Sequence, residues 1–353
     1  INGMENIYKL FVASIVGLLL FSCAGIRTIT IQTNEPPQIP LPETVNNILI
    51  IDNAGKQPND VGHTWKQVGK SDAEKVEAKN DSISIIFTEA LTQFLSEENY
   101  FNKVMIYDKP LRTDRRFWET IGLNPETMND LRLQTGADAI LSLEKLLLQT
   151  ERNDYFKQEG YPYGAMVGKI NSIIRVYMPT MEGKLPAVEF TDSLRWEGFD
   201  IQDGKAYADL ILPTHEEAMK ELALYAAEKM TYVFVPHSET QSRWYYTSNH
   251  SLMKEADVFA RSNKWPEAIS KWKAYYDKTK KNLDKAKAAS NIAFAYEMLD
   301  DLNSALEWIT ISKQLFDQST TNNSLDRKRA ELYKNEIQRR KDNYDKSNAM
   351  KLN

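Results

Sequence analysis

The chain has 353 residues, of which 42% are hydrophobic and 26% are charged, and its formal net charge is −5. This charge offers no basic surface for a phosphate backbone, so the composition argues against a nucleic-acid-binding protein. A chain of this length exceeds one typical hydrophobic core, and we therefore expect two domains. The single cysteine, Cys23, and the four scattered histidines do not form a metal-binding pattern.

The first element is a short apolar segment that ends at the cysteine. Residues 10–21 follow one basic residue, which is typical of a secretory signal peptide, and they are too few to span a bilayer as a helix. The ending Leu-Phe-Ser-Cys at residues 20–23 resembles the lipobox of bacterial lipoproteins. An ordinary signal peptidase could instead cut after Ala24 and release a soluble protein. Because an exported lone cysteine has no disulfide partner, we predict a cleaved signal peptide over residues 1–22 and a lipid on Cys23.

A proline-rich segment follows the cysteine. Residues 23–45 contain four prolines and no helical period, so they are predicted to be an extended, lipidated tether. In Bacteroides-like lipoproteins, acidic residues directly after the cysteine signal surface export, and in enterobacteria an aspartate beside it causes retention in the inner membrane. Ala24, Gly25 and Ile26 show neither signal. By this resemblance we expect an outer-membrane lipoprotein that faces the periplasm.

Residues 46–240 combine strand and helix patterns. The expected strands before the final helix span residues 47–52, 103–107, 139–149, 170–178 and 188–197. The last two alternate apolar and polar residues, which predicts an antiparallel hairpin. Helices are expected from residue 83, from Pro125 to Thr135, and from Thr214, where Glu217 completes a capping box. The pattern predicts a mixed α/β sandwich with helices on one or both faces of a mixed sheet.

One short stretch of this region resembles a known class. Residues 135–143 are similar to the gly-ala-asp sequence that begins a central strand in envelope lipoproteins of the curli-secretion and penicillin-binding-protein-activator type. A helix stop followed by a buried strand explains the same letters, so the resemblance adds no function by itself.

Residues 241–345 are helical throughout and contain a repeat with a period of 37 residues. The recurring small and aromatic positions are Ala256, Phe259, Ala268, Ala293, Tyr296, Ala305, Ala330 and Tyr333. Their spacing resembles the tetratricopeptide repeat, in which small residues let paired helices approach closely. The third copy has only its first helix, through Arg340, and is expected to cap the stack. Residues 346–353 are predicted to be a polar tail. The overall fold class is therefore α+β, with an α/β domain followed by an all-α repeat domain.

Three aromatic residues, Trp244, Tyr245 and Tyr246, precede the repeats. Clustered aromatic residues are usually buried in a core or an interface, so we expect them in the joint between the two domains. The alternative is an exposed aromatic platform that binds a glycan or a peptide.

The sequence contains no recognisable catalytic motif. The His-Glu pair that begins at His215 lacks the second histidine of a zinc protease, because Met219 occupies that position. Glu144, Asp192 and Glu197 lie on predicted strands, where they could form an acid/base pair for hydrolysis, but solvent-facing positions on the sheet explain them better. Asp192 interrupts an apolar series, which suggests a buried, paired carboxylate or a bulge. We expect no enzyme activity, no cofactor and no metal.

The whole arrangement resembles Bacteroides-type lipoproteins that combine a lipobox, an α/β body and a tetratricopeptide-like tail. This resemblance implies location and architecture but no activity. We predict a non-enzymatic envelope lipoprotein, anchored to a membrane by its lipid, whose repeats bind a protein or peptide partner in their concave face. The alternative is a regulator or recognition module for cell-wall or glycan handling that uses the α/β domain. The oligomeric state is left open.

Overall fold

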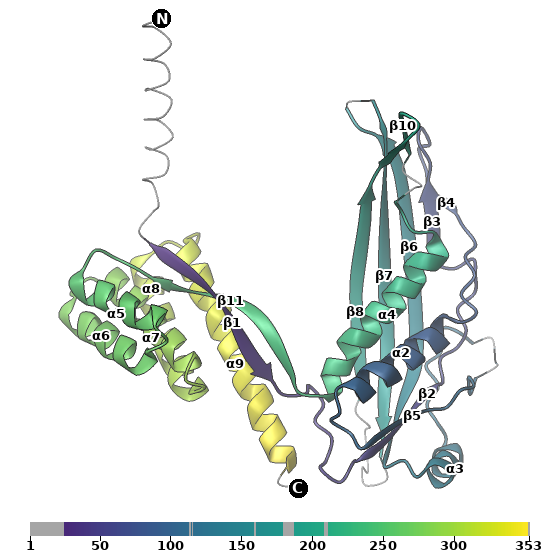
Figure 1. Cartoon of the computed structure of the whole chain (residues 1–353), viewed down its shortest axis with the longest axis horizontal. Helices are drawn as coiled ribbons and strands as arrows, with labels where there is room; N and C mark the ends of the chain where they lie inside the picture. The colour runs from purple at the N-terminus through teal and green to yellow at the C-terminus, as the bar shows by residue number, and fades with distance from the viewer. Residues whose placement is uncertain are drawn as a thin grey trace, which may run out of the picture. The chain divides into compact units, whose positions relative to one another are not determined.

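The computed structural model describes residues 25–112, 114, 116–158, 160–178, 187–207 and 211–351 (Figure 1). The predicted signal peptide and Cys23 lie outside these residues. The described chain divides into two compact units, which we call the α/β unit (Pro36–His237) and the helical unit (the chain up to Glu35 together with Ser238–Asn348). The predicted α+β class is confirmed. In the described part of the chain, no helix combines the length and the apolar character needed to cross a membrane.

A seven-stranded mixed sheet forms the centre of the α/β unit. Its strands are β2 (Asn47–Asp52), β3 (His63–Lys66), β4 (Glu74–Lys75), β5 (Lys103–Ile106), β6 (Ala139–Phe156), β7 (Pro162–Tyr177) and β8 (Ala187–Gly198). The long strand β6 pairs with β7 along one edge. Its other edge pairs in parallel with β2 over its first half and with β3 over its second half. β7 and β8 form the predicted antiparallel hairpin. A small separate hairpin consists of β9 (Asp200–Gln202) and β10 (Lys205–Tyr207).

Helices cover both faces of the sheet. α2 (Ile83–Glu97) and α4 (His215–Phe234) pack with each other and with one face, where Ile48 and Ile50 of β2 lie in the larger core (Figure 1). On the opposite face, Leu49 and Ile51 pack with Leu131 of α3 (Pro125–Thr135). Because strand side chains alternate between faces, the continuous apolar run of β2 serves both cores.

The predicted ends of two helices are confirmed. The Asn124 side chain accepts a hydrogen bond of 2.8 Å from the backbone N–H of Thr127, and Gly136 ends α3 with a φ of 69°. At the start of α4, Thr214 and Glu217 form the reciprocal hydrogen bonds of a capping box.

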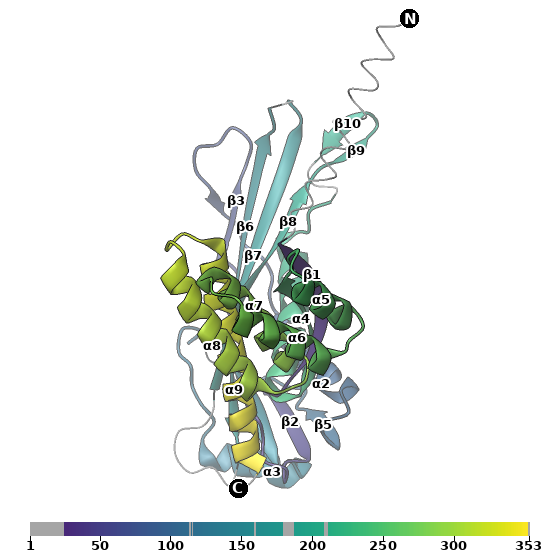
Figure 2. The same cartoon turned by 90° about the vertical axis from the view of Figure 1, so that its left-hand side faces the viewer.

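Consecutive helices form most of the helical unit, as the repeat predicts (Figure 2). They are α5 (Ser251–Arg261), α6 (Trp265–Lys278), α7 (Asn282–Glu297), α8 (Leu302–Ser319) and α9 (Leu325–Lys351). The first four form two successive pairs, and the third copy supplies only α9. This last helix continues beyond Arg340 and into the predicted polar tail. Before the tail, the hydroxyl of Tyr344 donates a hydrogen bond to the backbone oxygen of Asn34.

The predicted tether over residues 23–45 is wrong for ten of its residues. Ile26–Glu35 form β1, which pairs with β11 (His237–Tyr246) in a two-stranded ribbon within the helical unit. The physical reason is burial, because the alternating side chains of Ile31, Thr33 and Glu35 are buried. The predicted domain boundary at residue 240 falls inside β11.

Candidate functional site

The repeat positions form the core of the helical unit. The alanines of the pattern and Tyr333 are buried, and Phe259 and Tyr296 are partly buried against the same core. The buried alanines are Ala256, Ala268, Ala293, Ala305 and Ala330. These residues therefore hold the helices together and are not available to a partner.

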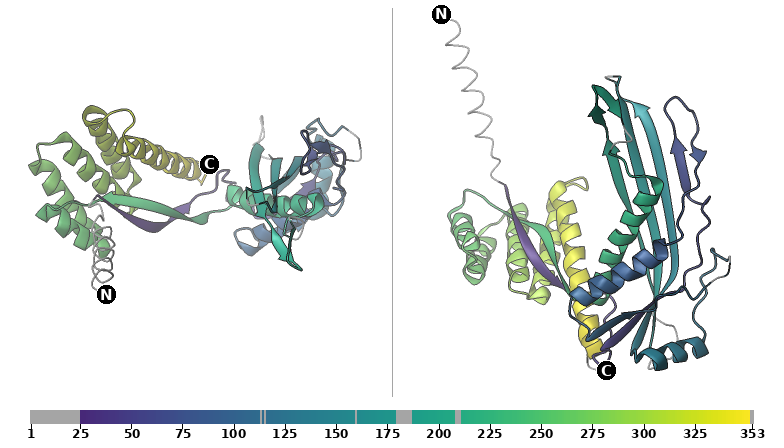
Figure 3. Two further views of the ribbon diagram at one scale, coloured as in Figure 1. Left: turned by 90° about the horizontal axis from the view of Figure 1, so that it is seen from above. Right: turned by 45° about the vertical axis from the view of Figure 1, so that its right-hand side comes forward.

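The β1–β11 ribbon lies against the first helix of each repeat copy. Arg27 of β1 forms an ion pair of 2.9 Å with Asp257 of α5. The Asn291 side chain of α7 exchanges hydrogen bonds of 2.6 and 2.7 Å with the backbone of Tyr246 in β11. Figure 3 shows the ribbon, in purple and green, running beside the yellow helix α9. The chain's own ribbon thus covers part of the face that the repeats were predicted to offer to a partner.

A buried charge network fixes the ribbon to α7 and α9. Glu297 accepts hydrogen bonds from Arg243 of β11 at 2.9 Å and from Arg340 of α9 at 2.6 Å, and also from the Tyr333 hydroxyl. Arg340 forms a second ion pair of 2.9 Å with Glu35 of β1. All five side chains are buried, and burial raises the pKa of Tyr333 well above its usual value. Because each buried charge has an opposite partner, removing one of these side chains would leave its partner buried without a counter-charge.

Two of the three predicted binding aromatics are not accessible. Tyr245 and Tyr246 are buried in the core of the helical unit, where their hydroxyls donate to Asp257 at 2.7 Å and to Asp326 at 3.1 Å. The predictions of an inter-domain joint and of an exposed platform are therefore wrong for these two residues. Trp244 is only half-buried, and its ring lies 5.9 Å from that of Tyr333.

Trp244 belongs to an open groove between β11 and α9. The groove has a volume of about 470 Å³ and also contains Tyr333, Leu332 and Arg339 of α9. Leu332 is 68% exposed, so its apolar side chain is accessible in the groove. Arg339 is held by Glu336 at 2.9 Å. Both β11 and α9 therefore contribute apolar and charged side chains to the groove, and its volume lies in the usual range for ligand sites. We call this the β11–α9 groove.

The candidate carboxylates of the α/β unit occupy different environments. Glu144 is buried, so its interpretation as solvent-facing is wrong. The register of β6 shifts between Leu143 and Lys145, and the Glu144 carboxylate accepts a hydrogen bond of 2.8 Å from Tyr177. Burial raises the pKa of Glu144. The bulge could not be predicted, because nothing in the local sequence marks it.

Asp192 and Glu197 lie on β8. Asp192 accepts a hydrogen bond of 2.5 Å from the Tyr225 hydroxyl, and the pairing of β7 with β8 is regular there, so it is a paired carboxylate and not a bulge. Glu197 is exposed and pairs with Arg195 at 2.6 Å, as its solvent-facing interpretation predicts. Both carboxylates therefore make structural contacts with neighbouring side chains at the surface of the α/β unit.

Two histidines that lie far apart in the sequence share one hydroxyl. The Nδ1 atoms of His63 and His215 both lie 2.7 Å from the Oγ1 of Thr150 on β6. Burial, followed by the neighbouring His215, lowers the pKa of His63 to about 4. Burial also lowers the pKa of His215. Among the described residues, no three His, Cys, Asp or Glu side chains lie close enough to hold a metal ion. The pair therefore forms a neutral, buried contact between β3 and α4.

Comparisons with known proteins divide the chain in a similar way. Residues 45–246 match a family model described as a domain of unknown function, DUF8603, which ends with β11. Residues 254–339 match a second domain of unknown function, DUF6340, within α5 to α9. No curated protein matches the chain. Because the first match covers more than half of the sequence, the chain belongs to the DUF8603 family.

Proposed function

We propose that this protein is a non-enzymatic lipoprotein of the cell envelope that binds a segment of another protein in the β11–α9 groove. The observation that supports this proposal is the apolar part of the groove lining, which includes the largely exposed Leu332 and the half-buried Trp244. A short extended segment with an apolar side chain fits such a groove, because Leu332 and Trp244 both line it. The β11 strand of the ribbon forms one side of the groove, and the helices alone would not provide this side.

The proposed location follows from the sequence around Cys23. A lipid on this residue would anchor the chain in the outer membrane, with the folded units in the periplasm. β1 begins at Ile26, three residues after the cysteine, and three residues span at most about 10 Å. The helical unit, and not a long tether, would then stand next to the lipid surface.

Site-specific photo-cross-linking in cells tests the groove. A photoreactive amino acid at position 332 is expected to capture a defined envelope protein. The same amino acid at Leu325 is the matched control, because this leucine lies on the same helix, is 67% exposed and does not line the groove. Leu332→Glu should abolish capture by a probe at Trp244, whereas Leu325→Glu should not. Equal cross-linking from positions 332 and 325 would show that the groove is not a binding site.

Metabolic labelling with a fatty-acid analogue tests the anchor. The wild-type chain is expected to incorporate the label and to sediment with membranes. Cys23→Ser should lose both properties, because no other cysteine can take its place. A Cys23→Ser protein that labels as strongly as the wild type would refute the lipid anchor without bearing on the groove.

A further inference from the structure

The carboxyl end of β2 is a topological switch point of the sheet. β2 lies between two parallel neighbours, β5 on one edge and β6 on the other. After β2 the chain first forms β3 and β4. It then passes through α2 to reach β5, and through α3, on the opposite face, to reach β6. In open α/β sheets, ligands bind beyond the carboxyl ends of the strands at such a point, because the diverging connections leave a crevice.

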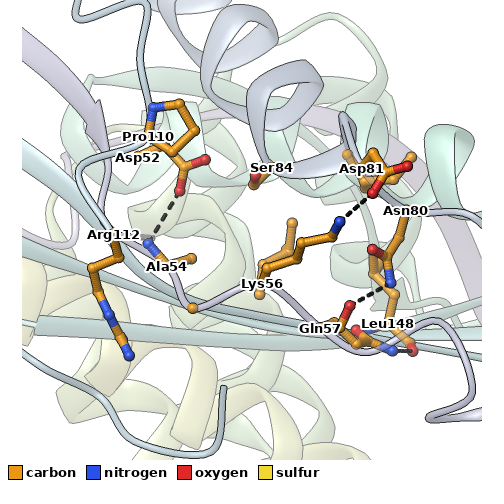
Figure 4. A pocket seen from close by; sticks show the side chains of 13 residues that line it. Asp52, Ala54, Lys56, Gln57, Asn80, Asp81, Ser84, Pro110, Arg112 and Leu148 are labelled. Atoms are coloured by element: carbon orange, nitrogen blue, oxygen red, sulfur yellow. Dashed lines mark hydrogen bonds and ion pairs between the residues drawn. The ribbon is translucent and has the colours of Figure 1, made fainter. Parts of the chain in front are cut away.

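A cavity of about 120 Å³ lies at this point (Figure 4). Asp52 at the end of β2, the following loop, Asn80 and Ser84 near the start of α2, and the loop after β5 line it. Gln57 forms part of the wall of the cavity. Its side chain makes the hydrogen bonds to β6 that a neighbouring strand would otherwise make. The Gln57 amide donates to the backbone oxygen of Leu148 at 2.7 Å and accepts from its N–H at 2.8 Å. The cavity is therefore built into the sheet and not into a loop alone.

Asp52 is a buried carboxylate without a cationic partner. Its side chain is 3% exposed and accepts a hydrogen bond of 3.1 Å from the backbone N–H of Ala54. No Lys, Arg or His among the described residues forms an ion pair with it. Burial raises the pKa of Asp52, although the Ser84 hydroxyl and the Ala54 N–H oppose this rise. A buried carboxylate is costly unless a cation or several donors stabilise it, so this cavity favours a positively charged guest.

Asn80 supplies a second acceptor at the same cavity. It is 8% exposed, and its Nδ2 donates a hydrogen bond of 2.9 Å to the backbone oxygen of Gln57. Because a carbonyl oxygen can only accept, this bond fixes the amide orientation and turns Oδ1 away from Gln57. The buried Oδ1 has no hydrogen-bond partner among the described residues. Asn80 thus adds a buried, unpartnered acceptor to the lining that contains the Asp52 carboxylate.

The two cationic side chains that line the cavity, Arg112 and Lys56, each pair with another group. Arg112 donates to Asp114 at 2.8 Å and to the backbone oxygen of Glu119 at 2.9 Å, and Figure 4 shows it directed away from Asp52. Lys56 pairs with Asp81 at the mouth of the cavity, where both side chains are more than half exposed. Such an exposed pair is weak and can rearrange when a ligand enters.

We propose that this cavity binds a primary ammonium group, with the buried Asp52 carboxylate as its acceptor. The site is separate from the β11–α9 groove, and the proposal does not depend on it. A cavity of about 120 Å³ has room for about four water-sized groups, so it admits a small amine or the end of a longer chain that carries one.

Titration of the purified protein with ethylammonium, followed by NMR, tests the proposal. A ligand of three non-hydrogen atoms is expected to bind with a dissociation constant of about 1 mM or weaker, and to shift signals of residues around Asp52. Asp52→Asn keeps the shape and should weaken binding by about tenfold or more. Asp192→Asn, which removes a carboxylate elsewhere in the α/β unit, should leave binding unchanged. Thermal unfolding of both variants checks that they fold.

Three further titrations separate the remaining possibilities. Propionate, which has a carboxylate in place of the ammonium, should not bind at the cavity. Lys56→Gln should leave ethylammonium binding unchanged or stronger, because it removes a competing ammonium. Nα-acetyl-lysine amide shows whether the site accepts the end of a longer chain: its binding indicates a lysine-like source, and its failure beside bound ethylammonium indicates a free small amine. The proposal is overturned if ethylammonium does not bind, if propionate binds equally well, or if Asp52→Asn binds as tightly as the wild type.

Discussion

Acid should destabilise the α/β unit through His63. This residue is 1% exposed, and its pKa falls from 6.5 to about 4, chiefly because burial disfavours the imidazolium ion. Between these values the unfolded chain binds more protons than the folded chain. The free energy of unfolding is therefore unaffected by this difference above pH 6.5, and it decreases as the pH falls from 6.5 toward 4. A shift of this size corresponds to about 3 kcal/mol, since one pKa unit is worth about 1.4 kcal/mol.

The assay compares the wild type with His63→Asn, whose amide can occupy the position of Nδ1 beside Thr150. Urea unfolding, followed by NMR signals of β3 and β6, should show the free energy of unfolding of the wild type falling more steeply with acid. The two proteins should differ in this fall by about 3 kcal/mol between pH 7 and pH 4. His215 titrates in both proteins, so the difference between them reports His63 together with its interaction with His215. A His63 imidazole signal that titrates near pH 6.5 in the folded protein would refute the reasoning.

Two further predictions concern packing in each unit. Glu297→Ala should destabilise the helical unit by about 3–5 kcal/mol in urea unfolding, because it leaves two buried arginines without their shared carboxylate. The exposed Glu307→Ala on α8 should stay within about 0.5 kcal/mol, and an equal effect of both would contradict this. Gly168→Ala should destabilise the α/β unit by about 1–3 kcal/mol, because an added Cβ would lie 2.6 Å from Leu222 of α4; an unchanged melting temperature would show that α4 can shift.

Features with a local cause were predicted from the sequence. The cap at Asn124, the left-handed Gly136 and the capping box at Thr214 each depend on residues within four positions, and all are present. The repeat of small and aromatic residues also predicted the helix pairs, because Ala256 and its counterparts must sit where two helices approach closely.

Features with partners far along the chain were not predicted. β1 was assigned to a tether because of the prolines around it, and its partner strand β11 lies about 200 residues away. Glu144 was placed in solvent because neither its bulge nor the Tyr177 hydroxyl can be recognised from neighbouring residues. The pairing of His63 with His215 through Thr150 likewise depends on the alignment of β3 with β6. Sequence periodicity carries no information about which side chains meet across such distances.

The position of the two ribbon strands in the sequence explains why the domain organisation differs from a simple succession of two domains. β1 precedes the α/β unit and β11 follows it, yet the two strands pair with each other and complete the helical unit. The α/β unit is therefore inserted between two strands of its neighbour and is tied to it by both ends of its chain. Glu35 at the end of β1 pairs with Arg340 of α9, and Arg243 of β11 shares the Glu297 carboxylate with that same arginine. Because these charges are buried and each has an opposite partner, β1, the strand nearest the predicted lipid, is held to α9 by specific contacts, and a force on a lipid at Cys23 would reach the helical unit first.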